Sequence, residues 1–232
     1  MRRRVAALAL LLGGLAGLAA PSAAQKATLG GQFRYWAFNN HNDLRDVLGY
    51  WAKGPLHVQL EYWDFVRGQD VFRPEIGLHL RDRRRSVTTL QWRHERRRQD
   101  RFTLGTDQVL NDRWVARAEV SPIVTPDSTE WVVSGGLDFY WASYSFAQVT
   151  VIRDPRGDGL WVVPLRVRLA TEANDWVQVT VAPASERTLG WAVDTKVRWL
   201  RLGVERNSRF DFTDLDNTIY TIGFELALRR RE

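Results

Sequence analysis

Few side chains in this sequence are suited to acid–base or nucleophilic chemistry near neutral pH. The sequence has four histidines and no cysteine, which excludes thiol catalysis, thiolate metal sites and disulfides. A hydrolytic active site would need a histidine beside a serine or a carboxylate. His41 has Asp43 and Asp46 close by in the sequence, and Ser128 or Ser208 would be the nucleophile. The alternative interpretation is that His41 is a solvated loop residue.

The short motifs that accompany common enzyme chemistries do not occur in the sequence. It contains no G-x-S-x-G, no H-E-x-x-H and no phosphate-binding G-x-x-x-x-G-K-[ST]. We therefore expect no cofactor and no metal, and the sequence favours a non-enzymatic protein. An enzyme acting on lipid or lipopolysaccharide is the alternative, and it predicts that the His41→Ala variant loses activity.

The first 24 residues have the pattern of a cleaved export signal. Three arginines at 2–4 precede an apolar run over 5–19 and small residues at 22–24. We predict a signal peptide over 1–24 and a single mature domain over 25–232, with a retained anchor helix as the alternative. Without the three arginines the net charge falls from +6 to 6 − 3 = +3. This small excess predicts that nucleic acid is not a partner.

An alternation of apolar and polar residues dominates the rest of the chain. It is clearest over 218–228, where Tyr220 and Ile222 share one face and Thr221 and Glu225 share the other. Successive side chains of a strand point to opposite faces, so this period of two predicts β-strands with one apolar and one polar face. A soluble sandwich and a transmembrane barrel would both show it.

Three features favour a transmembrane barrel. The alternating segments are about ten residues long, which is enough to cross a bilayer at a tilt. Short and longer polar connections alternate along the chain, as hairpins that cross a membrane require. Tryptophans near predicted strand ends suit the headgroup level, namely Trp51, Trp114, Trp131, Trp141, Trp161 and Trp176. A soluble periplasmic β-protein that binds sugars through exposed tryptophan is the alternative.

We predict an all-β fold, an antiparallel transmembrane β-barrel of fourteen strands. The expected ranges are 28–38, 45–53, 56–66, 73–81, 86–94, 101–108, 113–122, 129–139, 143–153, 160–169, 175–182, 188–194, 197–206 and 218–228. Twelve strands is the alternative, because the expected turn at Asp194, Thr195 and Lys196 is weak. Pro164 removes a ladder donor inside a strand, and we expect a β-bulge there.

Several stretches resemble outer-membrane β-barrels of the YaiO type. They are Gly159–Leu169, Asp175–Val181, Leu202–Glu205 and Thr218–Leu228. The resemblance implies a barrel domain across most of the mature chain, and it transfers no functional residue. The chain departs from the common ending of such barrels, because basic residues follow Leu228 where an aromatic assembly signal is usual.

The polar faces of the predicted strands place charges of both signs inside the barrel. The residues expected there are Arg34, Glu61, Arg73, Glu75, Arg81, Arg93, Arg117, Glu119, Asp138, Arg166, Arg168, Arg201, Glu205 and Glu225. Paired across strands, they would fill the lumen and stiffen the wall. Left partly unpaired, Arg166, Arg168 and Arg201 would attract anions into a water-filled pore. The sequence favours the structural, largely plugged lumen, with an anion-preferring pore as the alternative.

These predictions imply a location and partners. We expect export to the outer membrane, with lipid, lipopolysaccharide and the barrel-assembly machinery as partners. If the first strand starts in the periplasm, Arg96, Arg97 and Arg98 lie on an outer loop. Guanidinium groups bind phosphates in a bidentate manner, so this cluster would contact lipopolysaccharide. The alternative is a solvated basic loop.

Fractionation separates the barrel from the soluble alternative. We expect the protein to pellet with membranes, to need detergent for extraction, and to migrate anomalously on gels unless boiled. A closed barrel retains its shape in cold detergent, which is the reason for the anomalous migration. Recovery of the protein in the supernatant, with one gel mobility before and after boiling, would contradict the barrel.

Overall fold

The computed structural model describes residues 27–40, 42–67, 70–82, 85–94, 99–154, 160–183, 189–206 and 217–228. The predicted signal peptide, His41, Ser208 and the arginine cluster at 96–98 lie outside these residues. Within the described ranges, no helix is long and apolar enough to cross a membrane.

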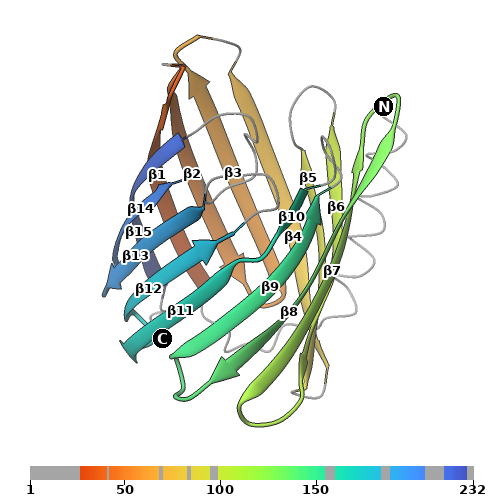
Figure 1. The fold of residues 1–232 in the computed structure, drawn as a ribbon, viewed down its shortest axis with the longest axis vertical. Coiled ribbons are helices and arrows are strands. Elements are labelled where there is room, and N and C mark those ends of the chain that lie inside the picture. Colours follow the sequence, from red (N-terminus) through yellow and green to blue (C-terminus); the bar gives the residue numbers. More distant parts are fainter. Residues whose placement is uncertain are drawn as a thin grey trace.

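The alternating segments form strands, and their bounds lie close to the predicted ranges. The strands are β1 (Ala27–Phe38), β2 (Leu44–Lys53), β3 (Leu56–Phe65), β4 (Val71–Asp82), β5 (Ser86–His94), β6 (Asp100–Val109), β7 (Trp114–Val124), β8 (Thr129–Tyr140), β9 (Phe146–Asp154), β10 (Leu160–Val162), β11 (Leu165–Glu172), β12 (Asp175–Ala182), β13 (Gly190–Val197), β14 (Leu200–Arg206) and β15 (Asn217–Leu228). Neighbouring strands pair antiparallel, and β1 also pairs with β15, so the sheet closes on itself (Figure 1).

Strands β10 and β11 lie in line against β9 and act as one strand that Pro164 interrupts. Val162 pairs with Ile152 and Leu165 with Val149, so the register is the same on both sides of the interruption. The predicted bulge is therefore wrong. The carbonyl of Pro164 still accepts a hydrogen bond from the Thr150 N–H at 3.1 Å, so only the donor that proline lacks is lost. Counted in this way, the barrel has the fourteen strands that the sequence predicts.

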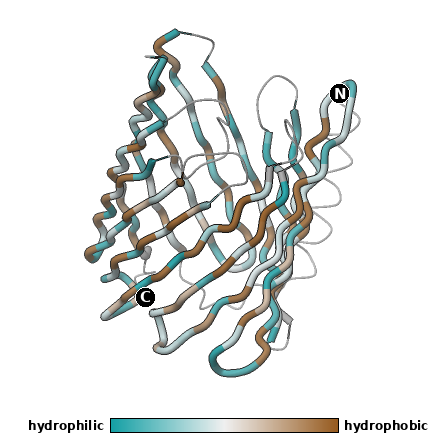
Figure 2. Tube along the Cα trace, in the orientation of Figure 1, coloured by the Kyte–Doolittle hydropathy of each residue, from teal (hydrophilic) through white to brown (hydrophobic). Residues whose placement is uncertain are grey.

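The apolar face of the sheet lies on the outside of the barrel. Side chains from all around it, such as Phe33, Leu60, Val133, Leu165 and Ile222, are between 40% and 52% exposed. Hydropathy alternates along the strands accordingly (Figure 2). A soluble sandwich buries its apolar face, whereas a membrane barrel turns it toward acyl chains. The closed sheet therefore has the polarity of a membrane barrel.

Tryptophans occupy both surfaces of the wall. Trp114, Trp131 and Trp161 are exposed on the outer face, as the predicted aromatic girdle requires. Trp176 was also expected in the girdle, but it shares the inner face with Gln178, which is buried. Its place in the alternation with the outward-facing valines of β12 is the reason.

The hairpin between β13 and β14 turns later than predicted. The turn was expected at 194–196, but it lies at Arg198 and Trp199, where Arg198 has a φ of 57°. A two-residue hairpin requires positive φ, and the Asp175 carboxylate fixes this one by accepting the Arg198 N–H at 2.6 Å. As a result, Asp194 and Lys196 belong to β13.

The assignment of faces can be tested on β11. Leu165→Arg and Val167→Arg each place a charge on the lipid face, which should cost about 2–4 kcal/mol near the midplane. Arg166→Leu changes the lumenal side and should be milder. Heat resistance of the detergent-extracted variants measures the effect. Wild-type behaviour of both arginine variants, with a loss in Arg166→Leu, would show that the faces are exchanged.

Candidate functional site

One arc of the lumen, formed by β1 to β4, consists of charged side chains that have almost no contact with water. Arg34 forms ion pairs with Asp46 and Glu61, and Glu61 Oε2 also lies 3.2 Å from Arg73 Nη1. The exposed fraction of these side chains is at most 5%. Because a buried charge without a partner is strongly unfavourable, these pairs hold four neighbouring strands in one arrangement.

An apolar cluster packs beside these ion pairs inside the lumen. It lies at the end of the barrel where β1 joins β2 and β3 joins β4, which we call the loop end. Its members are Trp36, Phe38, Leu44, Trp63 and Ile219. The Arg73 guanidinium lies 4.1 Å from the Trp63 ring centroid and links the cluster to the ion pairs. This side of the lumen is therefore filled by protein.

A second group lies toward the opposite end, where β2 joins β3 and β13 joins β14, which we call the turn end. Glu75 Oε1 is 3.0 Å from His57 Nε2, and Glu75 Oε2 is 3.8 Å from Arg93 Nη1. The rings of His57 and His79 stack with centroids 4.8 Å apart. The side chain of Arg81, expected here, lies outside the described part of the structure.

The arc formed by β6 to β8 is also charged, but water reaches it. Arg117 Nη2 lies 2.7 Å from Asp138 Oδ2, and Arg117 Nη1 lies 3.4 Å from Asp107 Oδ2. Arg101 pairs with Glu119 at 3.2 Å. The side chains of Arg117 and Glu119 are 38% and 41% exposed. The pair of Arg117 with Asp107, both 38% exposed, contributes about 0–1 kcal/mol, far less than a buried pair, whereas Asp138 is fully buried.

Two lumenal arginines of β11 have no carboxylate partner among the described residues. Arg166 Nε lacks a hydrogen-bond partner. Arg168 donates Nε–H and Nη2–H to the side-chain oxygen of Gln178 at 3.0 and 2.7 Å, and Gln178 is neutral. The positive charge of both arginines is thus left without a carboxylate at contact distance in the described lumen.

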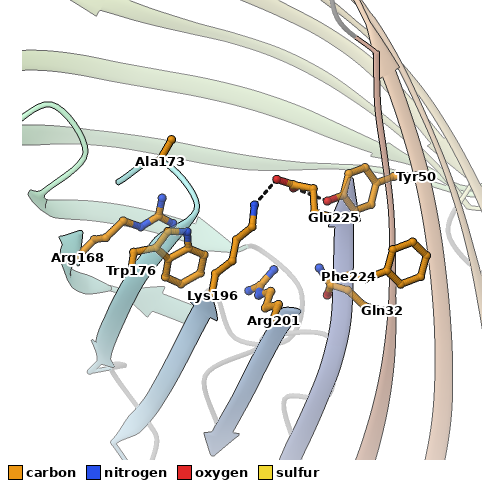
Figure 3. Close-up of a pocket in the computed structure, with 9 residues that line it drawn as sticks. All are labelled: Gln32, Tyr50, Arg168, Ala173, Trp176, Lys196, Arg201, Phe224 and Glu225. Atoms are coloured by element: carbon orange, nitrogen blue, oxygen red, sulfur yellow. Dashed lines mark hydrogen bonds and ion pairs between the residues drawn. The ribbon is translucent and has the colours of Figure 1, made fainter. Parts of the chain in front are cut away.

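Next to these arginines, a cavity of about 280 Å³ opens in the lumenal wall at the turn end. Its lining residues are Gln32, Tyr50, Arg168, Ala173, Trp176, Lys196, Arg201, Phe224 and Glu225. Figure 3 shows the basic side chains of β11 to β14 facing Tyr50 and Glu225, while the Phe224 ring points away. Glu225 accepts from both Lys196 Nζ and the Tyr50 hydroxyl. Arg201 Nη2 pairs with Asp194 at 3.0 Å.

The catalytic hypothesis around His41 relies on two acids, and both already have partners in the structure. Asp43 accepts from the Tyr35 hydroxyl and from the Phe38 N–H, the latter at 3.1 Å. Asp46 faces the lumen and pairs with Arg34. Across the described ranges, no three histidine, aspartate or glutamate side chains are placed to hold a metal ion.

The comparisons with known proteins concern the fold. Neither a family model nor a curated protein matches the chain. Solved porin structures do match. A KdgM porin has a TM-score of 0.55 at 8% identity, over 86% of this chain and 99% of that chain. Outer membrane protein Omp33 of Acinetobacter baumannii has 0.56 at 11% identity, over 88% and 98%. A mutant of the Rhodopseudomonas blastica porin has 0.52 at 7% identity, over 87% and 100%.

The fold is that of porin-like outer-membrane barrels. At these identities the likeness extends to the fold alone. The resemblance to the YaiO type gains no support from these matches and stays a prediction.

The contrast between the packed and the hydrated arc can be measured with matched substitutions. Glu61→Gln leaves Arg34 and Arg73 buried with less negative charge, so we expect a loss of about 3–5 kcal/mol of unfolding free energy. Glu119→Gln changes a partly exposed pair and should cost less than about 1 kcal/mol. Denaturant unfolding in detergent, followed by tryptophan fluorescence, gives both values. Equal losses would contradict the difference between the arcs.

Proposed function

We propose that the protein is a non-enzymatic channel of the outer membrane whose lumen prefers small anions. The observation that carries this proposal is the asymmetry of the lumen. The arc from β1 to β4 is packed with ion pairs in which both side chains are buried. In the other arcs at least one side chain of each pair reaches water: Arg117, Glu119, Arg201 and Glu225 are between 30% and 41% exposed. Hydrated charges along a closed wall are the usual lining of a diffusion pore.

The preference for anions follows from the unpaired cations. Arg166 and Arg168 point into the lumen without a carboxylate partner in the described chain, and Lys196 and Arg201 lie nearby on β13 and β14. Rings or arcs of arginine and lysine favour the passage of anions. The match to a KdgM porin in complex with disordered oligogalacturonate, an acidic oligosaccharide, supports an anionic solute.

The rival function is a structural barrel whose lumen is plugged by paired charges. That function would require partners for the arginines of β11, and the loss of these arginines would leave acids unpaired. The described residues provide no such acids at contact distance for Arg166 and Arg168. The packed arc fits the structural role, and the β11 to β14 arc favours the channel.

Conductance across a planar bilayer tests the channel directly. In a potassium chloride gradient we expect a steady conductance whose reversal potential shows preference for chloride. The double variant Arg166→Gln with Arg168→Gln should shift the reversal potential toward potassium, because no carboxylate at contact distance neutralises these two charges in the described lumen. Arg45→Gln removes the same charge from an exposed pair with Asp64 outside the lumen and should not change selectivity.

Two results would refute the channel. The first is a wild-type protein that inserts into the bilayer and carries no steady current, which would favour the plugged barrel. The second is a double variant whose reversal potential equals that of the wild type, because the two arginines would then not set the selectivity.

A further inference from the structure

The cavity beside Trp176 is lined by charged, hydrogen-bonding and aromatic groups that could all bind the same class of small molecule. We propose that it binds a hydroxylated monocarboxylate, such as a single sugar acid, in the wall of the lumen. This inference deepens the proposed channel function and rests on it only for the route by which the ligand arrives.

The charge balance of the cavity fits one negative charge. Three cations line or border the site, Arg168, Lys196 and Arg201, and two carboxylates neutralise two of them: Glu225 pairs with Lys196, and Asp194 with Arg201. Three cations less two carboxylates leave one positive charge, on Arg168. A monoanion would balance the charge of the lining, and Arg166, two residues away on β11, lies outside that lining.

The free edge of Arg168 suits a carboxylate. Its Nε and Nη2 atoms bond to Gln178, which fixes the plane of the guanidinium. The guanidinium carbon lies 4.2 Å from the Trp176 ring centroid and 5.1 Å from that of Phe146, so the group is also held by aromatic rings. No hydrogen bond of the described chain uses Nη1. A guanidinium positioned by its neighbours loses little freedom when a carboxylate binds.

The opposite side of the cavity suits hydroxyl groups. Glu225, whose side chain is 39% exposed, lies with Tyr50 across from Arg168, and Gln32 adds a side-chain amide (Figure 3). Carboxylate oxygens accept from ligand hydroxyls, a phenol oxygen accepts as well, and an amide does both. A simple anion would leave these groups without a ligand partner and would be repelled by Glu225. A ligand that carries hydroxyl groups in addition to a carboxylate therefore matches both sides of the cavity.

The apolar surface of the site is the indole of Trp176, which the Arg168 guanidinium contacts from one side. An aromatic ring offers a flat surface for the C–H face of a sugar ring, while the polar groups around it fix the orientation. The volume of about 280 Å³ is near the lower limit of small-ligand cavities, which begin at about 300 Å³, and suits one sugar unit.

Calorimetric titration of the purified full chain in detergent tests the site without any need for conductance. The probes are glucuronate, glucose and acetate at low ionic strength. Glucose lacks the carboxylate and acetate lacks the hydroxyl groups. We expect glucuronate to bind at least tenfold more tightly than either of the others. Equal binding of acetate would reduce the site to a general anion site and overturn the proposal. Equal binding of glucose would overturn it as well.

Matched variants locate the binding. Arg168→Gln should weaken glucuronate binding at least tenfold. Arg166→Gln removes the same charge two residues away on the same strand, outside the cavity lining, and should weaken it less than threefold. Glu225→Gln should lower the ratio of glucuronate to acetate affinity, because it removes an acceptor for hydroxyl groups and a charge that repels acetate. Equal effects of the two arginine variants would indicate a diffuse lumenal field and refute the site.

The two proposals fail in different ways. Binding of glucuronate by a barrel that carries no current would refute the channel and support the site. A chloride-selective current with no preference among the three probes would support the channel and refute the site. Heat-dependent gel mobility of each variant establishes that it is folded before its affinity is compared.

Discussion

The closed ladder of backbone hydrogen bonds is the constraint on which the rest of the molecule depends. Inside a bilayer no water is available to pair with a free N–H or C=O, so a sheet can cross only if it has no edge. Pairing of β1 with β15 removes that edge. Closure then fixes which residue of each alternating pair faces lipid and which faces the lumen. Every later feature, from the ion pairs to the cavity, follows from this division.

The division also explains how one wall can be both rigid and hydrated. Where facing side chains meet, as Arg34 does with Asp46 and Glu61, water is excluded and the charges must pair. Where the lumen leaves space, as around Arg117, the arginine side chain remains 38% exposed although its partner Asp138 is buried. The sequence shows the charges but not the space. The difference between the two arcs is therefore a property of the closed barrel and not of any single strand.

The fold was largely predictable from the sequence, and the cavity only in part. Period two identified the strands because it depends on local geometry alone, and it is also the basis on which Arg168, Arg201 and Glu225, which line the cavity, were assigned to the polar face. Trp176 was assigned to the girdle by residue type, although its alternation with Val177 and Val179 indicated the inner face. Lys196 was assigned to an expected turn at 194–196, where Asp194 is a residue type common in turns. The apolar cluster around Trp36 was not foreseen, since lumenal faces are usually polar.

The bond between Tyr50 and Glu225 joins residues 175 positions apart. It bridges β2 and β15, the strands on either side of β1, and so spans the seam where the two ends of the barrel meet. Contacts between distant parts of a chain carry the largest loop-closure entropy and form slowly. The bond between Tyr50 and Glu225 can form only when the two ends of the sheet have met, so a change at Glu225 should affect closure of the barrel during folding as well as the cavity of the folded protein.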